Sequence, residues 1–219
     1  MFFIKVTRFS GDDLAVVSHS FAATRRKESR HVEYSGNFSA DIIKGVAHRC
    51  SHGYPQVLLC AAEKAAEPFP TTFWLVCPHL TRIAAWIEAQ NGVTKLEESL
   101  RGHEKPWRKY HVKHSLLRLS MIPEARRKFL RTYRRRIYST LRCGGVGGIL
   151  YAARAASGSR KFSSVTAKCI HLQLASYLGF GQHPASDWLK NNISSWECDG
   201  GVCSARRKFC ADGGIYPPK

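Results

Sequence analysis

The stretch PFPTTFWLVCPHLTRIAAWIEAQNG, residues 68–92, decides the fold of this chain because its hydrophobic pattern changes from that of a strand to that of a helix. The apolar run at 72–77 has the length of a buried strand and follows a turn signal at 68–70. Pro78 ends that strand and suits a helix start, after which apolar residues recur every three or four positions as far as Asn91-Gly92. A strand that leads straight into an amphipathic helix predicts a mixed α and β domain.

The same reasoning assigns the remaining elements. A second buried strand is expected at 55–60, between turn signals, and a short strand is a candidate at 3–9. Helices are expected at 93–100, at 104–119, from Pro123 to the glycines at 144–148, at 165–178 and at 184–193. We therefore expect an α+β fold, in which several helices pack on a small sheet of short strands in the N-terminal half and the C-terminal half is mostly helical.

With 219 residues, 44% of them hydrophobic, the chain has room for one domain with a substantial core. We expect a basic leader at 1–39, a single α+β domain at 40–197 and a Cys/Gly-rich tail at 198–219. Basic residues among Ser and Thr make the leader a candidate organellar targeting segment, whereas its acidic residues argue against one, so a mitochondrial and a cytoplasmic location both stay open. The apolar runs predict neither a secretory signal nor a transmembrane segment.

The net charge of +18 predicts an anionic partner. Residues 101–142 contain 14 Lys/Arg against only two Glu, so the charge is concentrated there. On the helix expected after Pro123, an apolar stripe should face inward and display a row of guanidinium groups, which match phosphate oxygens. The stripe is Phe129, Tyr133, Ile137 and Leu141, and the candidate contacts are Arg127, Arg131, Arg134, Arg135 and Arg136. RNA is the favoured polyanion; an acidic protein, a phospholipid surface and a merely solvated basic face remain alternatives.

The eight cysteines form no C-x2-C pair. Only Cys198 and Cys203, with four residues between them on a Gly-rich segment, have a spacing that lets two thiolates face one ion. Cys60, Cys143 and Cys210 are interpreted as small hydrophobic residues. We expect the histidines in polar or basic surroundings to be exposed, namely His19, His31, His103, His111 and His114.

Three blocks, RCSHGYPQV at 49–57, PFPTTFWLVCPHL at 68–80 and KCIH at 168–171, resemble an uncharacterised bacterial family labelled domain of unknown function 501. They occur in the family's order, and the resemblance covers about residues 41–203. It implies that Cys50, Cys77 and Cys169 belong to a shared core, and it supplies no reaction.

A common metal site follows as a hypothesis from that shared core. Cys50, Cys77 and Cys169, with one thiolate from Cys198 or Cys203, would suit tetrahedral zinc or a four-iron cluster, and His171 is the substitute ligand. The main hypothesis is thus a metal-binding basic domain, with Zn or an Fe–S cluster, that contacts RNA or another polyanion in an organellar or ribosome-associated setting. The alternative is a cysteine-dependent enzyme in which Arg49 or His52 activates Cys50 as a nucleophile or sulfur carrier.

Overall fold

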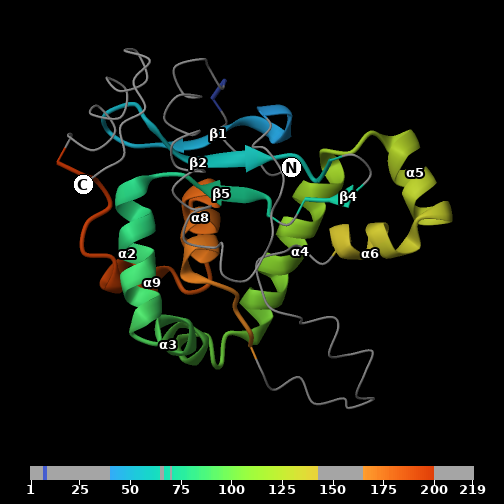
Figure 1. Cartoon of the computed structure of the whole chain (residues 1–219). Helices are drawn as coiled ribbons and strands as arrows, with labels where there is room; N and C mark the ends of the chain where they lie inside the picture. Colours follow the sequence, from blue (N-terminus) through green and yellow to red (C-terminus); the bar gives the residue numbers. More distant parts are fainter. Residues whose placement is uncertain (1–6, 9–39, 65–66, 70, 143–164, 200–219) are drawn as a thin grey trace, which may run out of the picture.

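A computed structural model describes residues 7–8, 40–64, 67–69, 71–142 and 165–199 (Figure 1). Its centre is a three-stranded antiparallel sheet in the order β1–β2–β5, formed by β1 (Ile43–Arg49), β2 (Pro55–Cys60) and β5 (Phe73–Leu75). Leu58 of the middle strand pairs with Val46 on one side and with Trp74 on the other. All six residues of β2 are buried. The middle strand is therefore the core of the sheet, as its unbroken apolar run predicts.

Small elements complete the β-region. A 3-10 turn, η1 (Ala40–Ile42), precedes β1, and a two-stranded hairpin of β3 (Glu63–Lys64) and β4 (Glu67–Pro68) lies between β2 and β5. Of the strand expected at 3–9, the structure describes Thr7 and Arg8, and Thr7 forms an isolated antiparallel bridge with Val46. The turn between β1 and β2 contains Gly53 at a φ of 83°, a conformation that favours glycine.

Seven helices lie within the described residues: α2 (Pro78–Ala89), α3 (Gly92–Ser99), α4 (Glu104–Ser120), α5 (Glu124–Tyr133), α6 (Arg135–Arg142), α8 (Ile170–Phe180) and α9 (Ser186–Asn192). Figure 1 shows α8 beneath the sheet, with α2 on one side and α4 on the other. Most of α8 is buried, so it is the central helix of the domain. The α+β fold predicted from the sequence is confirmed.

The contact between α8 and the sheet depends on a small residue. A Cβ atom at Gly179 of α8 would lie 2.5 Å from two ring carbons of Phe73, which is a core residue of β5. Only hydrogen at this position lets the helix approach the aromatic ring so closely. Gly181 then ends α8 in the left-handed conformation, with a φ of 68°.

A buried polar cluster joins α4 to α8. The hydroxyl of Ser176 contacts both the Tyr110 hydroxyl and, at 2.6 Å, Nε2 of His114. The His183 ring accepts a hydrogen bond from the Ala185 amide through Nδ1, so its Nε2–H donates to Gln173 at 3.0 Å. His111 packs edge-on against Trp107 with ring centroids 4.6 Å apart. The members of this cluster are Trp107, Tyr110, His111, His114, Gln173, Ser176 and His183, and each is at most 6% exposed.

The expectation that His111 and His114 are exposed is wrong. The two rings lie on the inner face of α4, against Trp107 and Ser176. Burial lowers the pKa of His111 to about 4, with the nearby charge of Lys168 adding to the effect, and lowers that of His183 to about 3. The pKa of His114 is also lowered, first by burial and then by the other positive groups around it. All three imidazoles are therefore neutral at neutral pH.

The single helix expected after Pro123 is in fact two helices, because the chain breaks at Arg134 (φ −132°, ψ 54°). Leu130 and Leu141 are both buried in one small cluster with Ala62 and Ile122. In a straight helix these two leucines would lie about 16 Å apart along the axis. The break folds α6 back on α5 and brings both leucines to the same cluster, which is the physical reason for the difference.

This break also overturns the predicted apolar stripe. Leu141 is buried and Ile137 is half-buried, as expected, but Phe129 is 42% exposed and Tyr133 is 73% exposed. Leu130, which the stripe did not include, takes the inward position on α5. Two aromatic rings that were assigned to the core are thus on the surface.

Two further differences separate the structure from the predicted elements. Residues 165–169, expected to be helical, precede the first turn of α8 in non-helical backbone, and the amide of Ala167 there donates to Glu97 at 2.8 Å. The strand β1 has no counterpart in the prediction. In the described ranges, no helix has both the length and the apolar character needed to cross a membrane.

Candidate functional site

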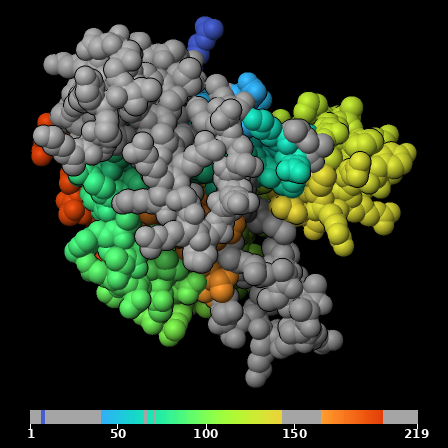
Figure 2. Space-filling view, in the orientation of Figure 1, coloured from blue at the N-terminus to red at the C-terminus, as the bar shows by residue number. Residues whose placement is uncertain are grey.

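The arginine–aromatic surface is the exposed basic part of α5 and α6. We define it as Phe129, Arg131, Tyr133, Arg134, Arg135 and Arg136, all of which are exposed. The rings of Phe129 and Tyr133, one helical turn apart on α5, have centroids 5.4 Å apart with an interplanar angle of 40°. Figures 1 and 2 show that α5 and α6 project at one edge of the molecule, away from the sheet. Guanidinium groups and aromatic rings are therefore exposed side by side on this surface.

Two neighbouring arginines hold this surface in place. Arg126 makes a bidentate hydrogen-bonded ion pair with Glu63 of β3, at 2.9 and 3.1 Å, and its guanidinium carbon lies 5.4 Å from the centroid of Phe129. Arg127 is half-buried and donates to the Leu119 carbonyl at 3.4 Å. Of the five arginines predicted to contact nucleic acid, four are exposed, and Arg127 instead connects α5 to the end of α4.

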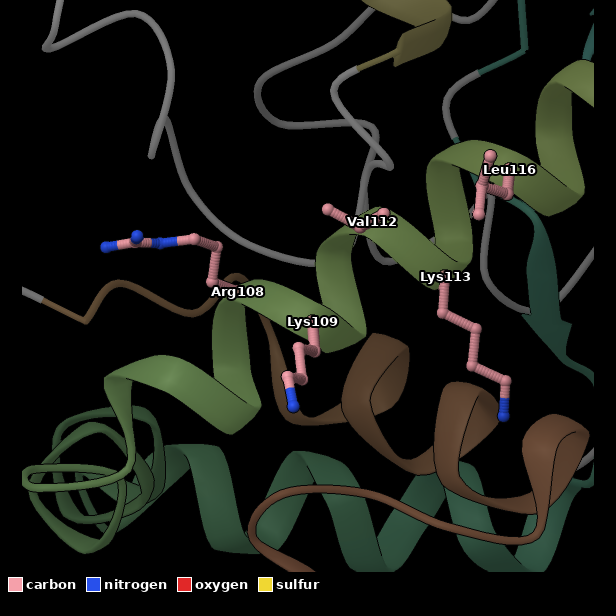
Figure 3. Close-up of a pocket in the computed structure, with 5 residues that line it drawn as sticks. All are labelled: Arg108, Lys109, Val112, Lys113 and Leu116. Carbon is pink, nitrogen blue, oxygen red and sulfur yellow. The ribbon is translucent and has the colours of Figure 1, made fainter.

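A second group of cations lies along α4. Arg108, Lys109 and Lys113 line a hollow together with the exposed side chains of Val112 and Leu116 (Figure 3). Figure 3 shows Lys109 and Lys113 directed toward α8 while Val112 and Leu116 point away from it. The Lys113 ammonium lies 4.0 Å from the centroid of the Phe180 ring of α8. Positive charge is thus distributed along α4 as well as α5 and α6.

Cys50, Cys77 and Cys198 lie near one another at the end of the sheet where α2 begins, but their three sulfur atoms are not all within 4.8 Å of one another. Cys50 follows β1, Cys77 is the N-cap residue of α2, and the segment that carries Cys198 is hydrogen-bonded to Ser51 and His52 beside Cys50 and to His79 beside Cys77. Burial raises the pKa of the Cys77 thiol, and the nearby Cys198 and Cys50 raise it further, against the opposing effect of two backbone hydrogen bonds.

Hydrogen bonds fix the crossing segment in place. The Glu197 carboxylate accepts from the amide and hydroxyl of Ser51, at 3.1 and 3.2 Å. His52 donates to the Cys198 carbonyl at 3.0 Å, and Gln56 donates to the Trp196 carbonyl at 2.9 Å. These hydrogen bonds keep Cys198 close to the turn that follows Cys50. Cys203, Cys143 and Cys210 lie outside the described residues.

The environment of Cys50 favours a buried thiol over a nucleophile. Cys50 is 8% exposed. The side chain of Arg49 is directed to Thr7 and to the carbonyls of Gly53 and Arg8, and the ring of His52 is engaged by Cys198. Both groups that were expected to activate Cys50 thus make these hydrogen bonds to other partners. Cys60 is fully buried, and burial raises the pKa of its thiol to about 12, so its interpretation as a small hydrophobic residue is confirmed.

Cys169 does not join the other three thiols. It is the N-cap residue of α8 and lies beside Glu88 of the last turn of α2, whereas Cys77 caps the opposite end of that helix. Eleven residues of helix separate Cys77 from Glu88, about 16 Å at the α-helical rise. The predicted ion shared by Cys50, Cys77 and Cys169 is therefore not the arrangement in this structure, because α2 holds its two ends apart.

Cys169 instead has Glu88 and His171 as neighbours. Nδ1 of His171 donates to the Glu88 carboxylate at 2.9 Å. Burial acts to lower the pKa of His171, but hydrogen bonds with Cys169 and Glu88 and their charges outweigh it and raise the pKa to about 9. Burial acts to raise the pKa of Glu88, and His171 with the α8 backbone amides outweighs it and lowers that pKa. Glu88 had no place in the sequence-based site, since a lone glutamate in an amphipathic helix carries no signal of its own.

The comparisons with known proteins give one result. The model of the family described as Protein of unknown function (DUF501) matches residues 46–208, which is well over half of the chain. No curated protein and no solved structure matches. The match includes all three blocks whose resemblance was noted in the sequence. The chain therefore belongs to the DUF501 family.

Proposed function

We propose that this protein binds single-stranded RNA through the arginine–aromatic surface. The observation that carries the proposal is the exposed Phe129–Tyr133 pair, 42% and 73% exposed, on a helix followed directly by exposed Arg134, Arg135 and Arg136. Exposed neighbouring aromatic rings leave apolar area in water, which a partner with flat π-faces would cover. Guanidinium groups beside them match the phosphates that link such faces in a nucleic acid.

Unpaired bases suit this surface better than a duplex. Single-stranded bases are free to stack on aromatic side chains, whereas the bases of a duplex are already stacked on one another. Glu124 is the only acidic residue of α5 and α6, and Glu63 nearby is already paired with Arg126. Repulsion of phosphates at this surface is therefore small. A ribosome-associated setting, either in the mitochondrion or in the cytoplasm, would supply single-stranded RNA.

The test is fluorescence anisotropy of a labelled oligouridylate of about 20 nucleotides, enough to span a typical single-strand site. Phe129→Ala and Tyr133→Ala should each weaken binding by about 1–3 kcal/mol, or about 5- to 100-fold, because each removes one stacking platform. Trp86→Ala is the matched control: Trp86 is 63% exposed on α2, outside the proposed surface, and its removal should leave the affinity unchanged.

The charge contribution is tested separately. Arg131→Glu, Arg134→Glu and Arg135→Glu together should weaken binding. They should also make the slope of log K against log salt less steep by about 2, because each of the three lost phosphate contacts contributes about 0.7. The control reverses three exposed cations elsewhere, Arg82, Lys95 and Lys190, with the same change in net charge.

Heparin distinguishes RNA from a polyanion without bases. The two aromatic variants should bind heparin as the unchanged protein does and lose affinity for RNA alone. Equal losses of RNA affinity in the triple arginine variant and in its charge-reversed control would show that only net charge matters. That outcome, or unchanged RNA binding by both aromatic variants, would exclude the proposed surface.

A further inference from the structure

Glu88, Cys169 and His171 bring three different donor types to one point. One ligand atom from each, a carboxylate oxygen, a thiol sulfur and an imidazole nitrogen, lies within 4.8 Å of the other two. The carboxylate comes from the last turn of α2, and the other two groups come from the start of α8. Among the residues that the structure describes, this is the only set of three or more such groups so close together.

The local backbone shows that the Cys169 thiol is not used to cap α8. Cys169 is the N-cap residue of α8 in extended backbone (φ −80°, ψ 157°), yet its side chain makes no capping hydrogen bond. Glu88 takes over that role, accepting from the amide of Ile170 at 2.6 Å and from the amide of His171 at 3.4 Å. The carboxylate is thereby fixed next to the imidazole, and the Cys169 residue remains exposed.

The donor set selects among cations. Magnesium and calcium prefer oxygen ligands alone, whereas zinc is bound by sulfur, nitrogen and oxygen together. Two anionic donors also balance the charge of a divalent ion. We propose that Glu88, Cys169 and His171 bind one Zn²⁺ ion, whose fourth coordination position faces solvent.

The open position follows from ligand number and exposure. Zinc prefers four ligands, and sites with three protein ligands keep one position for water or another small molecule. The side chains of His171 and Glu88 are 30% and 28% exposed, so solvent reaches the site from one side. This inference is independent of RNA binding, because the site lies at the α2–α8 contact and the arginine–aromatic surface lies on α5 and α6.

The test uses the full chain after removal of metal with a chelator. Zn²⁺ is titrated in competition with a chromophoric indicator, and one tightly held ion per chain is expected. Cys169→Ser and His171→Gln should each weaken binding by about 100-fold or more, since loss of a ligand should exceed the 10- to 100-fold cost of losing a supporting group. Glu88→Gln should also weaken binding, while its amide oxygen still caps α8.

Two measurements separate ligand loss from unfolding. Circular dichroism melting of the metal-free variants reports whether each still folds. Substitution with Co²⁺ should give a thiolate-to-metal charge-transfer band, which should disappear in Cys169→Ser and persist in Cys198→Ser, whose thiol lies toward the other end of α2.

Three results would overturn the proposal. The first is a folded protein that binds no zinc, and the second is zinc affinity that is unchanged in both Cys169→Ser and His171→Gln. The third is loss of the ion in Cys198→Ser alone, which would place zinc with Cys50 and Cys77 instead.

Discussion

Acid should destabilise this protein strongly, because three neutral histidines are buried in the cluster between α4 and α8. The pKa of His111 is lowered to about 4 and that of His183 to about 3, and the pKa of His114 is also lowered, in each case mainly by burial. In the unfolded chain each imidazole titrates near 6.5. Between these values the unfolded state binds more protons, so stability is fully present above about pH 6.5 and is lost as the pH falls.

The magnitude follows from proton linkage. For one imidazole shifted from about 6.5 to about 4, lowering the pH from about 7.5 to about 5 costs about 2 kcal/mol of unfolding free energy. His111 and His183 together give a loss of about 4 kcal/mol, a large part of the 5–15 kcal/mol typical of a folded protein, and His114 adds to the loss in the same direction. Lys113, Arg118 and Lys168 add positive charge near the cluster and oppose protonation further.

Urea unfolding followed by circular dichroism at the two pH values measures this loss. His111→Phe keeps an aromatic ring against Trp107 and removes one titrating group, so it should reduce the loss by about 2 kcal/mol. His103→Phe is the control, because His103 is exposed and should leave the pH dependence unchanged. A loss below about 1 kcal/mol in the unchanged protein, or the same loss in His111→Phe, would refute the reasoning.

Three further predictions concern packing and pairing. Gly179→Ala should lower the unfolding free energy by about 1–3 kcal/mol, because the new methyl group overlaps the Phe73 ring; a thermal melt tests this, and an unchanged melting temperature would contradict the close approach. Leu130→Ala should cost about 2–5 kcal/mol in chemical unfolding, since Leu130 is fully buried where α5 meets α6, and a cost near zero would show that the α5–α6 contact is not a packed core. A double-mutant cycle of Glu63→Gln and Arg126→Gln should give a coupling of about 1 kcal/mol or less, because the pair is partly exposed, and a coupling of several kcal/mol would mean that it is shielded from solvent.

Local signals predicted the elements whose limits are set locally. The strand at Pro55–Cys60 and the helix starting at Pro78 have the predicted bounds or nearly so, because turn residues and proline act on their immediate neighbours. The start of α8 could not be predicted in this way. Glu88, 82 residues earlier in the chain, caps the amide of Ile170 and so decides where that helix begins.

The candidate site was predictable to a similar extent. Composition placed the basic surface correctly on the region after Pro123, since charge is a property of the sequence itself. Which aromatic rings on that region are exposed depends on the break at Arg134, and that break depends on packing against Ala62, far away in the sequence. The histidines of α4 were predicted to be exposed for the same reason. Ser176, the buried hydrogen-bond partner of His114, lies on another helix.

The position of α8 in the chain has a consequence for biosynthesis. The face of β5 and β2 that α8 covers is complete once residue 75 has left the ribosome, yet α8 begins at Ile170, roughly 95 residues later. At about 5–20 residues per second, the nascent chain carries that apolar face for several seconds before its own covering helix emerges. Completion of the core is therefore a late event in synthesis, and during that interval the apolar face of the early strands is exposed to aggregation.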